Sequence, residues 1–407
     1  MRTFFIALAL LTAAMSAHGQ QSGVLLGLQV AQCSDAETHC NTILQTLWIA
    51  PEGGEIKLVA KLADSIVPRA DGFWRVGLRT YCETPDDESI TVKDVLFAVP
   101  VRERPTLDEE LVSCDDAQRM ARENYLRQES NKSNGNTWQK ALPSAADPCE
   151  SISIAVDFLN PSYASTITDH EFACAGRPSM GRSFDVWRLE SLGKTPVSLS
   201  TLFGAKAGDN YMRLARRALL ANGNKYAAHM SPPGEPPAKY RADRTLEELS
   251  RQEESCFPAD VNDGSWYIAR QEGHWLEQGG IRTFQLCGVE VDFALPRSMF
   301  DWSMIDKSLP VDMHWVREQV PDAKDAYCSP RKDLLVVFMK RDLMLVYKPK
   351  GEQIGAPVLS LPLPKWTSPF MAEWAVGAGV ERWTHELKTL QNEQLPEPIL
   401  PQVTTTK

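Results

Sequence analysis

The fold is most readily inferred from the stretch Ser183–Gly223, S-F-D-V-W-R-L-E-S-L-G-K-T-P-V-S-L-S-T-L-F-G-A-K-A-G-D-N-Y-M-R-L-A-R-R-A-L-L-A-N-G. Its first part, Phe184–Leu189, alternates like a strand, and a turn is expected at Leu192–Lys194. A helix is then predicted, because apolar side chains recur at the spacing of one helix face: Tyr211, Leu214, Ala215, Ala218 and Leu219. We expect this helix to end at Gly223.

Apolar segments on either side of this stretch predict short strands, since Gly, Pro, Asn or Asp residues separate them. They are Gly23–Val30, Ile43–Ile49, Ile56–Leu62, Phe73–Tyr81, Ile90–Val101, Ile152–Phe158, Trp266–Ile268, Ile281–Phe293, Leu334–Met339, Leu343–Tyr347 and Ala356–Leu361. We place a turn at Gly279–Gly280 and a second helix within Pro369–Leu390. The predicted fold class is α+β, with antiparallel sheets and a few packed helices in several domains.

Shifts in composition predict the domain boundaries. The expected segments are a signal peptide (1–19), a β-rich N-terminal domain (20–114), a helical and polar linker (115–148), an α+β domain (149–309), a β-hairpin unit with a C-terminal helix (310–390) and a disordered tail (391–407). The linker is polar and contains Asn131, Ser133 and Gly135, whereas the tail is rich in Pro and Thr.

The N-terminus has the three parts of a secretory signal peptide. Arg2 supplies a basic start, Phe4–Met15 is apolar, and Ala17-His18-Gly19 offers small residues for cleavage before Gln20. The apolar run is too short to cross about 30 Å of hydrocarbon, and no later stretch is long enough. We therefore expect a secreted or periplasmic protein with no membrane span after signal cleavage.

The net charge of the chain limits the kinds of molecule that it is expected to bind. The formal net charge is −10, and no run rich in Lys or Arg occurs. Nucleic acid is therefore not an expected partner, because its phosphates need a cationic surface. An acidic exported protein can instead attract a basic partner, although acidity also serves solubility.

The chain has nine cysteines, which an oxidising compartment favours as disulfides. Connectivity cannot be read from sequence alone. Because neighbouring cysteines emerge together during export, we predict the pairs Cys33–Cys40, Cys82–Cys114, Cys149–Cys174 and Cys256–Cys287, with Cys328 left over. Zinc is the competing interpretation, but no C-x-x-C pair is present, so we predict no metal site.

Catalytic motifs are missing from the sequence. The histidines other than His18 are scattered, and none forms H-E-x-x-H: His39, His170, His229, His274, His314 and His385. Gly176–Gly181 has the wrong spacing for the nucleophile elbow of a hydrolase, and Ser191–Lys194 spells S-x-x-K in a predicted turn. We therefore predict no catalytic, cofactor-binding or metal residues.

Two residue types leave an enzymatic alternative open. The chain has 53 Asp and Glu residues, and glycosidase carboxylates carry no fixed spacing. Its 11 tryptophans could stack on sugars, although core packing is the more ordinary role. A hydrolase or deacetylase acting on the cell wall would need a cleft with at least two carboxylates and exposed tryptophans.

The middle of the chain resembles a known extracytoplasmic domain. The resemblance lies in I-S-I-A-V-D-F-L (152–159), H-E-F-A-C-A-G-R-P (170–178), S-F-D-V-W-R-L (183–189) and G-K-T-P-V-S-L-S-T-L-F (193–203). The domain it resembles occurs in lysozyme-sensing anti-sigma factors and beside the catalytic domain of some secreted peptidoglycan deacetylases. That family has G-G-A-H where this chain has Cys174–Pro178, and an Asp where this chain has Thr201.

The resemblance implies a non-catalytic sensing or binding domain over residues 149–309, and no ligand residue is carried over. The leading hypothesis is an exported, non-catalytic envelope protein that binds or senses a protein or glycan partner. The alternatives are a cell-wall hydrolase or deacetylase using Asp and Glu, and a purely structural envelope protein held by disulfides.

Overall fold

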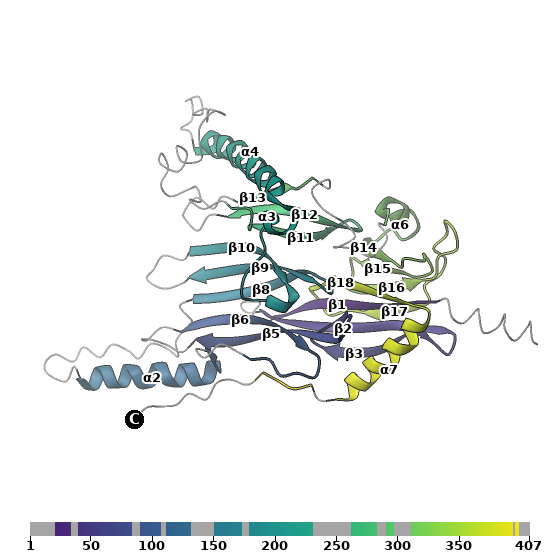
Figure 1. Ribbon diagram of the computed structural model, residues 1–407, viewed down its shortest axis with the longest axis horizontal. Coiled ribbons are helices and arrows are strands. Elements are labelled where there is room, and N and C mark those ends of the chain that lie inside the picture. The colour runs from purple at the N-terminus through teal and green to yellow at the C-terminus, as the bar shows by residue number, and fades with distance from the viewer. Residues whose placement is uncertain are drawn as a thin grey trace, which may run out of the picture.

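The computed structural model describes residues 21–33, 40–83, 90–106, 111–131, 150–172, 179–230, 262–282, 290–296, 311–393 and 395–398. The predicted signal peptide and residues 132–148 of the predicted linker lie outside these ranges. Several antiparallel sheets stack with a few helices around them, so the α+β class predicted from sequence is confirmed (Figure 1).

The strands and helices follow in chain order. In the first half they are β1 (Ser22–Cys33), β2 (Cys40–Glu52), β3 (Glu55–Ala63), β4 (Ser65–Arg69), β5 (Gly72–Glu83), β6 (Thr91–Pro100), β7 (Leu111–Val112), α2 (Cys114–Asn131), β8 (Glu150–Leu159), β9 (Tyr163–Phe172) and β10 (Ser179–Arg188). In the second half they are α3 (Leu199–Phe203), α4 (Ala205–Met230), β11 (Trp266–Gln271), β12 (His274–Arg282), β13 (Glu290–Ala294), α6 (Met313–Gln319), β14 (Ala323–Cys328), β15 (Leu335–Met339), β16 (Leu343–Tyr347), β17 (Leu359–Pro362), β18 (Thr367–Val376) and α7 (Ala378–Asn392).

The central sheet joins the two ends of the chain, in the order β18-β1-β2-β3. Ser22 at the start of β1 pairs with Val376 at the end of β18. β1 is a nearly continuous apolar run because both its faces are covered. On one face of β1, Val24 packs in an apolar cluster with residues of β15 and β16. On the other face, Leu25 packs with Trp48 and the helix α7.

A larger sheet has the order β10-β9-β8-β6-β5-β4, with β7 beside β5. All its neighbours are antiparallel except β6 and β8, which pair in parallel over Thr91–Lys93. β8 also reaches the central sheet, because the Val156 N–H donates to Gln29 Oε1 at 2.8 Å. A disulfide between Cys82 and Cys114 ties β5 to the start of α2.

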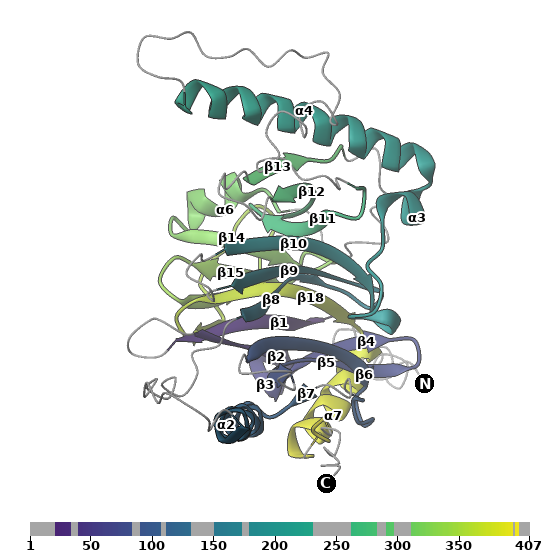
Figure 2. The same cartoon turned by 90° about the vertical axis from the view of Figure 1, so that its left-hand side faces the viewer.

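Two smaller sheets complete the layers. Strands β14–β17 form one, and its Leu335 and Val337 pack against Val316 of α6. Strands β11–β13 form the other, and both views place α4 across it (Figures 1 and 2). Tyr211 and Leu219, from the predicted apolar face of this helix, are buried there.

The stretch Ser183–Gly223 folds largely as expected. Phe184 stacks on Tyr267 of β11 at 4.4 Å, and Trp187 donates to Thr166 on the opposite face of β10. The helix differs in its end, because α4 runs through Gly223 to Met230. Glycine lowers helix propensity by only about 1 kcal/mol, so it does not end a helix that continues on both sides.

Two other expectations were wrong. Gly279–Gly280 is not a turn but lies within β12, where the rings of Phe293 and Phe184 pack against the bare backbone. A Cβ at Gly279 would lie 2.2 Å from Phe293 Cζ. Residues Pro369–Val376 form a strand instead of a helix, and the helix begins at Ala378.

Hydrogen bonds between β1 and β18 link the segments 20–114 and 310–390. Part of the tail expected to be disordered is placed: α7 continues to Asn392, and residues 395–398 lie beside β5. Among the described residues, no helix is long and apolar enough to span a membrane.

Candidate functional site

A cavity of about 770 Å³ opens between the β11–β12 hairpin and α6. Its lining is mostly charged or titratable: Glu272, His274, Asp312, Met313, His314, Arg317 and Glu318. A concave site in which several polar groups converge is the ordinary setting for ligand binding. We therefore take this cleft as the candidate site, and call it the α6 cleft.

One wall of the α6 cleft is a two-residue hairpin turn. Glu272 has φ 47° and Gly273 has φ 81°, and this pair of positive angles suits the right-handed twist of a hairpin. Glycine is also required by space, because a Cβ at Gly273 would lie 2.6 Å from the Val311 carbonyl oxygen. The turn therefore presents the side chains of Glu272 and His274 beside the segment that leads into α6.

A buried ion pair holds this turn in place. Asp325 of β14 accepts from the Gly273 N–H at 2.9 Å with one oxygen and from Arg270 Nε at 2.6 Å with the other. Both charged side chains are largely buried, with 6% of Arg270 and 12% of Asp325 exposed. The Arg270 guanidinium lies 3.6 Å from the centre of the Tyr327 ring, a cation–π contact. The hairpin is therefore fastened to a strand of a different sheet.

The opposite wall is α6, which begins with a capping aspartate. Asp312 accepts hydrogen bonds from the N–H groups of His314 at 2.9 Å and Trp315 at 3.4 Å. Met313 and Val316 are buried on the inner face of the helix. Residues 314, 317 and 318 share another face, as positions three and four apart do on a helix.

The carboxylates of the cleft are already engaged. Glu272 accepts from Arg317 Nη1 at 3.2 Å, and Glu318 lies 3.3 Å from His314 Nδ1. Asp312 caps the helix. Apart from its histidines, the described part of the lining carries three carboxylates and one guanidinium, so it favours cationic groups.

Two other kinds of site, a metal site and a sugar-binding site, can be compared with the described residues. Among these residues, no group of three or more His, Cys, Asp or Glu side chains could hold a metal ion. The described residues that line the α6 cleft include no tryptophan. Trp366, which is 53% exposed, lies in the loop before β18. The cell-wall hydrolase alternative needs exposed tryptophans beside carboxylates, and the described residues of the cleft do not bring these together.

The predicted cysteine pairs have different outcomes. Cys82 and Cys114 form the predicted disulfide, and Cys328 has a free thiol, as expected of the cysteine left over. Cys33 and Cys40 are backbone partners in the β1–β2 register. The other predicted pairs lie outside the described residues: Cys149, Cys174, Cys256 and Cys287.

Sequence reasoning did not find the α6 cleft. His274 and His314 stood out only as isolated histidines, and α6 was not predicted. A local signal was present, because D-M-H-W-V-R-E (312–318) combines a capping aspartate with polar residues at helical spacing. No family model matches this chain, and a search of curated proteins found no match either.

Proposed function

We propose that this protein is an exported, non-catalytic binding protein whose α6 cleft takes a basic segment of a partner protein. The observation that carries the proposal is the described lining of the cleft, in which three carboxylates stand beside the guanidinium of Arg317. The formal net charge of −10 acts in the same direction over longer distances, because it favours encounter with cationic partners.

Binding fits the cleft better than catalysis does. A general acid or base must be able to exchange a proton with a substrate. The carboxylates here cap a helix or pair with Arg317 and His314. Such groups are positioned and charged, which suits recognition of an ammonium or guanidinium group. The apparent signal peptide and the Cys82–Cys114 disulfide support export.

Calorimetric titration of the mature protein with a short oligolysine peptide tests the proposal. Glu318→Gln should weaken binding about fivefold, the effect expected of one partly exposed ion pair. Glu272→Gln should weaken it more, because the change also leaves the Arg317 charge to repel the peptide. Glu123→Gln, on the exposed side of α2 and far along the chain, is the matched control.

The outcomes separate the hypotheses. Equal affinity for the Glu318→Gln and Glu123→Gln proteins would exclude the α6 cleft as the site. Tighter binding of a deacetylated chitin oligomer than of oligolysine, sensitive to the same substitutions, would assign a glycan partner instead. Release of products from peptidoglycan fragments would show that the protein is an enzyme.

A further inference from the structure

A second polar site lies on β5, far from the α6 cleft. Arg75, Gly77 and Arg79 alternate along the strand and share one face. Phe97 is the cross-strand partner of Gly77, and a Cβ at Gly77 would lie 2.2 Å from its Cζ. The phenyl ring therefore rests on the glycine. The guanidinium carbons lie 5.4 Å (Arg75) and 5.8 Å (Arg79) from the ring centre.

Asp64 holds the two arginines in place. Its side chain is 4% exposed and accepts from Arg79 at 2.6 Å and 3.1 Å, one bond to each oxygen. Arg75 Nη1 lies 3.7 Å from the same carboxylate. Asp64 itself is fixed, because its N–H donates to the Leu44 carbonyl and its own carbonyl accepts from Thr46. The positions of Arg75 and Arg79 are therefore set by Asp64 and do not depend on a ligand.

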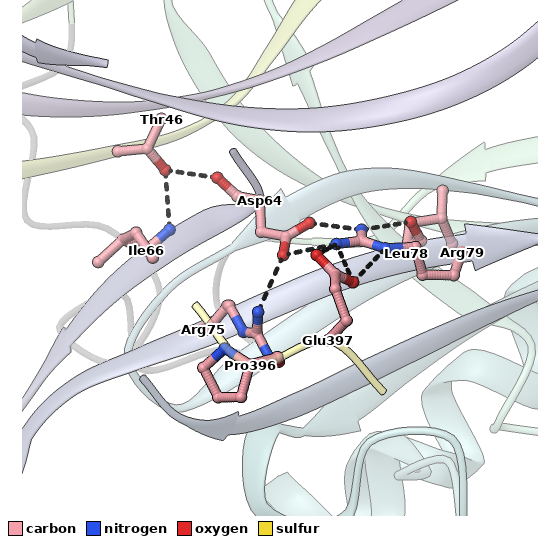
Figure 3. A network of polar contacts seen from close by, with 8 residues as sticks. All are labelled: Thr46, Asp64, Ile66, Arg75, Leu78, Arg79, Pro396 and Glu397. Carbon is pink, nitrogen blue, oxygen red and sulfur yellow. Dashed lines mark hydrogen bonds and ion pairs between the residues drawn. The ribbon is translucent and has the colours of Figure 1, made fainter. Parts of the chain in front are cut away.

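The occupant is a segment of this chain near the C-terminus (Figure 3). The Pro396 carbonyl accepts a hydrogen bond from Arg75 Nη2. The Glu397 carboxylate accepts from Arg79 Nε at 3.2 Å and Nη2 at 3.1 Å. Leu395 packs against the apolar cluster that includes Leu78. The contacts thus comprise one apolar side chain, one carbonyl and one carboxylate of an extended segment.

The site offers more donors than this segment uses. Arg75 is completely buried, yet its Nε and Nη1 have no hydrogen-bond partner among the described residues. Buried donors are normally satisfied, and a guanidinium stays charged at neutral pH. A carboxylate can accept two parallel bonds from an arginine, whereas the position beside Arg75 is held by a single carbonyl. The outward carboxylate, Glu397, is 63% exposed, so its ion pair adds little stability.

We propose that the Arg75–Arg79 site is a binding site for extended, carboxylate-bearing peptide segments, and that residues 395–397 occupy it as a displaceable intramolecular ligand. The acidic peptide recognised here and the basic partner proposed for the α6 cleft are separate ligands. Neither proposal depends on the other.

The test uses the full mature protein and a fluorescently labelled synthetic peptide with the sequence of residues 393–400, E-Q-L-P-E-P-I-L. Fluorescence anisotropy measures its binding. Glu397→Gln in the protein weakens the internal competitor, so the peptide should bind about fivefold more tightly than to the unmodified protein. Adding Arg79→Gln to that variant should weaken binding about fivefold, because Arg79 contacts the carboxylate directly.

Two controls guard against a folding defect. Circular dichroism must show the same spectrum for all variants. A peptide in which both glutamates are replaced by glutamine, E393Q and E397Q, should bind the Glu397→Gln protein about fivefold more weakly than the acidic peptide does. The proposal is overturned if the peptide binds no form of the protein, or if its affinity is the same for all of them. Dimerisation that depends on Glu397 would also overturn it, because the occupant would then come from a second copy.

Discussion

Asp325 is the residue whose loss should affect the α6 cleft most. Its carboxylate accepts one hydrogen bond from Arg270 and one from the Gly273 N–H, and both come from the β11–β12 hairpin. Asp325→Asn keeps the size of the side chain but removes the charge and one of the two acceptor oxygens. The hairpin should therefore be held less firmly against β14.

The expected loss follows from the bonds that change. A hydrogen bond to a charged group contributes about 1.5–3 kcal/mol, and removing one partner of a buried ion pair costs more than the bond alone. We therefore expect Asp325→Asn to lower the free energy of unfolding by about 3 kcal/mol. Binding of oligolysine should also weaken, since Glu272 and His274 flank the displaced turn.

Asp322→Asn is the matched control, three residues earlier in the chain. Asp322 lies 3.9 Å from Arg341, and these side chains are 51% and 85% exposed. Exposed pairs contribute about 0–1 kcal/mol, so this change should have little effect. Urea denaturation followed by near-ultraviolet circular dichroism measures both variants. A loss below about 1 kcal/mol for Asp325→Asn, or equal losses for the two, would refute the assignment of Asp325 as the anchor of the cleft.

Three further predictions concern local features. Gly273→Ala should destabilise the fold by about 2 kcal/mol, because φ is 81° and the new methyl group would meet the Val311 carbonyl. Gly53→Ala is the control, because φ is 62° there but the space around the residue is open. It should lower the stability less than Gly273→Ala does when both are measured by thermal denaturation. Cys82→Ser opens a disulfide with a sequence separation of 32 and should cost about 3–4 kcal/mol; if the unmodified protein melts at the same temperature with and without reductant, the disulfide contributes nothing. Burial raises the pKa of Asp157 to about 6, against the opposing effect of Arg182. The pKa of Asp157 is higher in the folded protein than the unfolded value near 3.9, so the protonated carboxyl favours the folded state. This contribution to the free energy of unfolding is therefore present below about pH 4 and is lost as the pH rises to about 6. Asp157→Asn should remove about 3 kcal/mol of that loss, and identical pH profiles would count against it.

Features determined by neighbours in sequence could be predicted. The hairpin of β15 and β16 is one, because Lys340-Arg341-Asp342 separates two apolar runs that pair directly. The inner face of α4 is another, since Tyr211 and Leu219 follow the helical period. In both cases the residues that determine the structure lie within a few turns or strands of one another.

Features determined by distant partners could not be predicted. Gly279 reads as a turn residue until Phe293 is known to pack on it. Residues 369–376 read as the start of a helix, because Val376, Val380, Trp383 and Leu387 continue a helical period into α7. Their strand depends on β1, at the other end of the chain. Apolar periodicity alone does not separate a buried strand from the adjoining helix when the two share a run.

Both candidate sites show why the missing motifs say little about function here. The α6 cleft combines the turn between β11 and β12, a helix that begins forty residues later and an anchor on β14. The arginine site draws Asp64, β5, Phe97 and Pro396 from four separate segments. In each site a buried arginine–aspartate contact sets the position of the groups that face a ligand. Such recognition depends on long-range packing, so its residues need not lie at a recognisable spacing in the sequence.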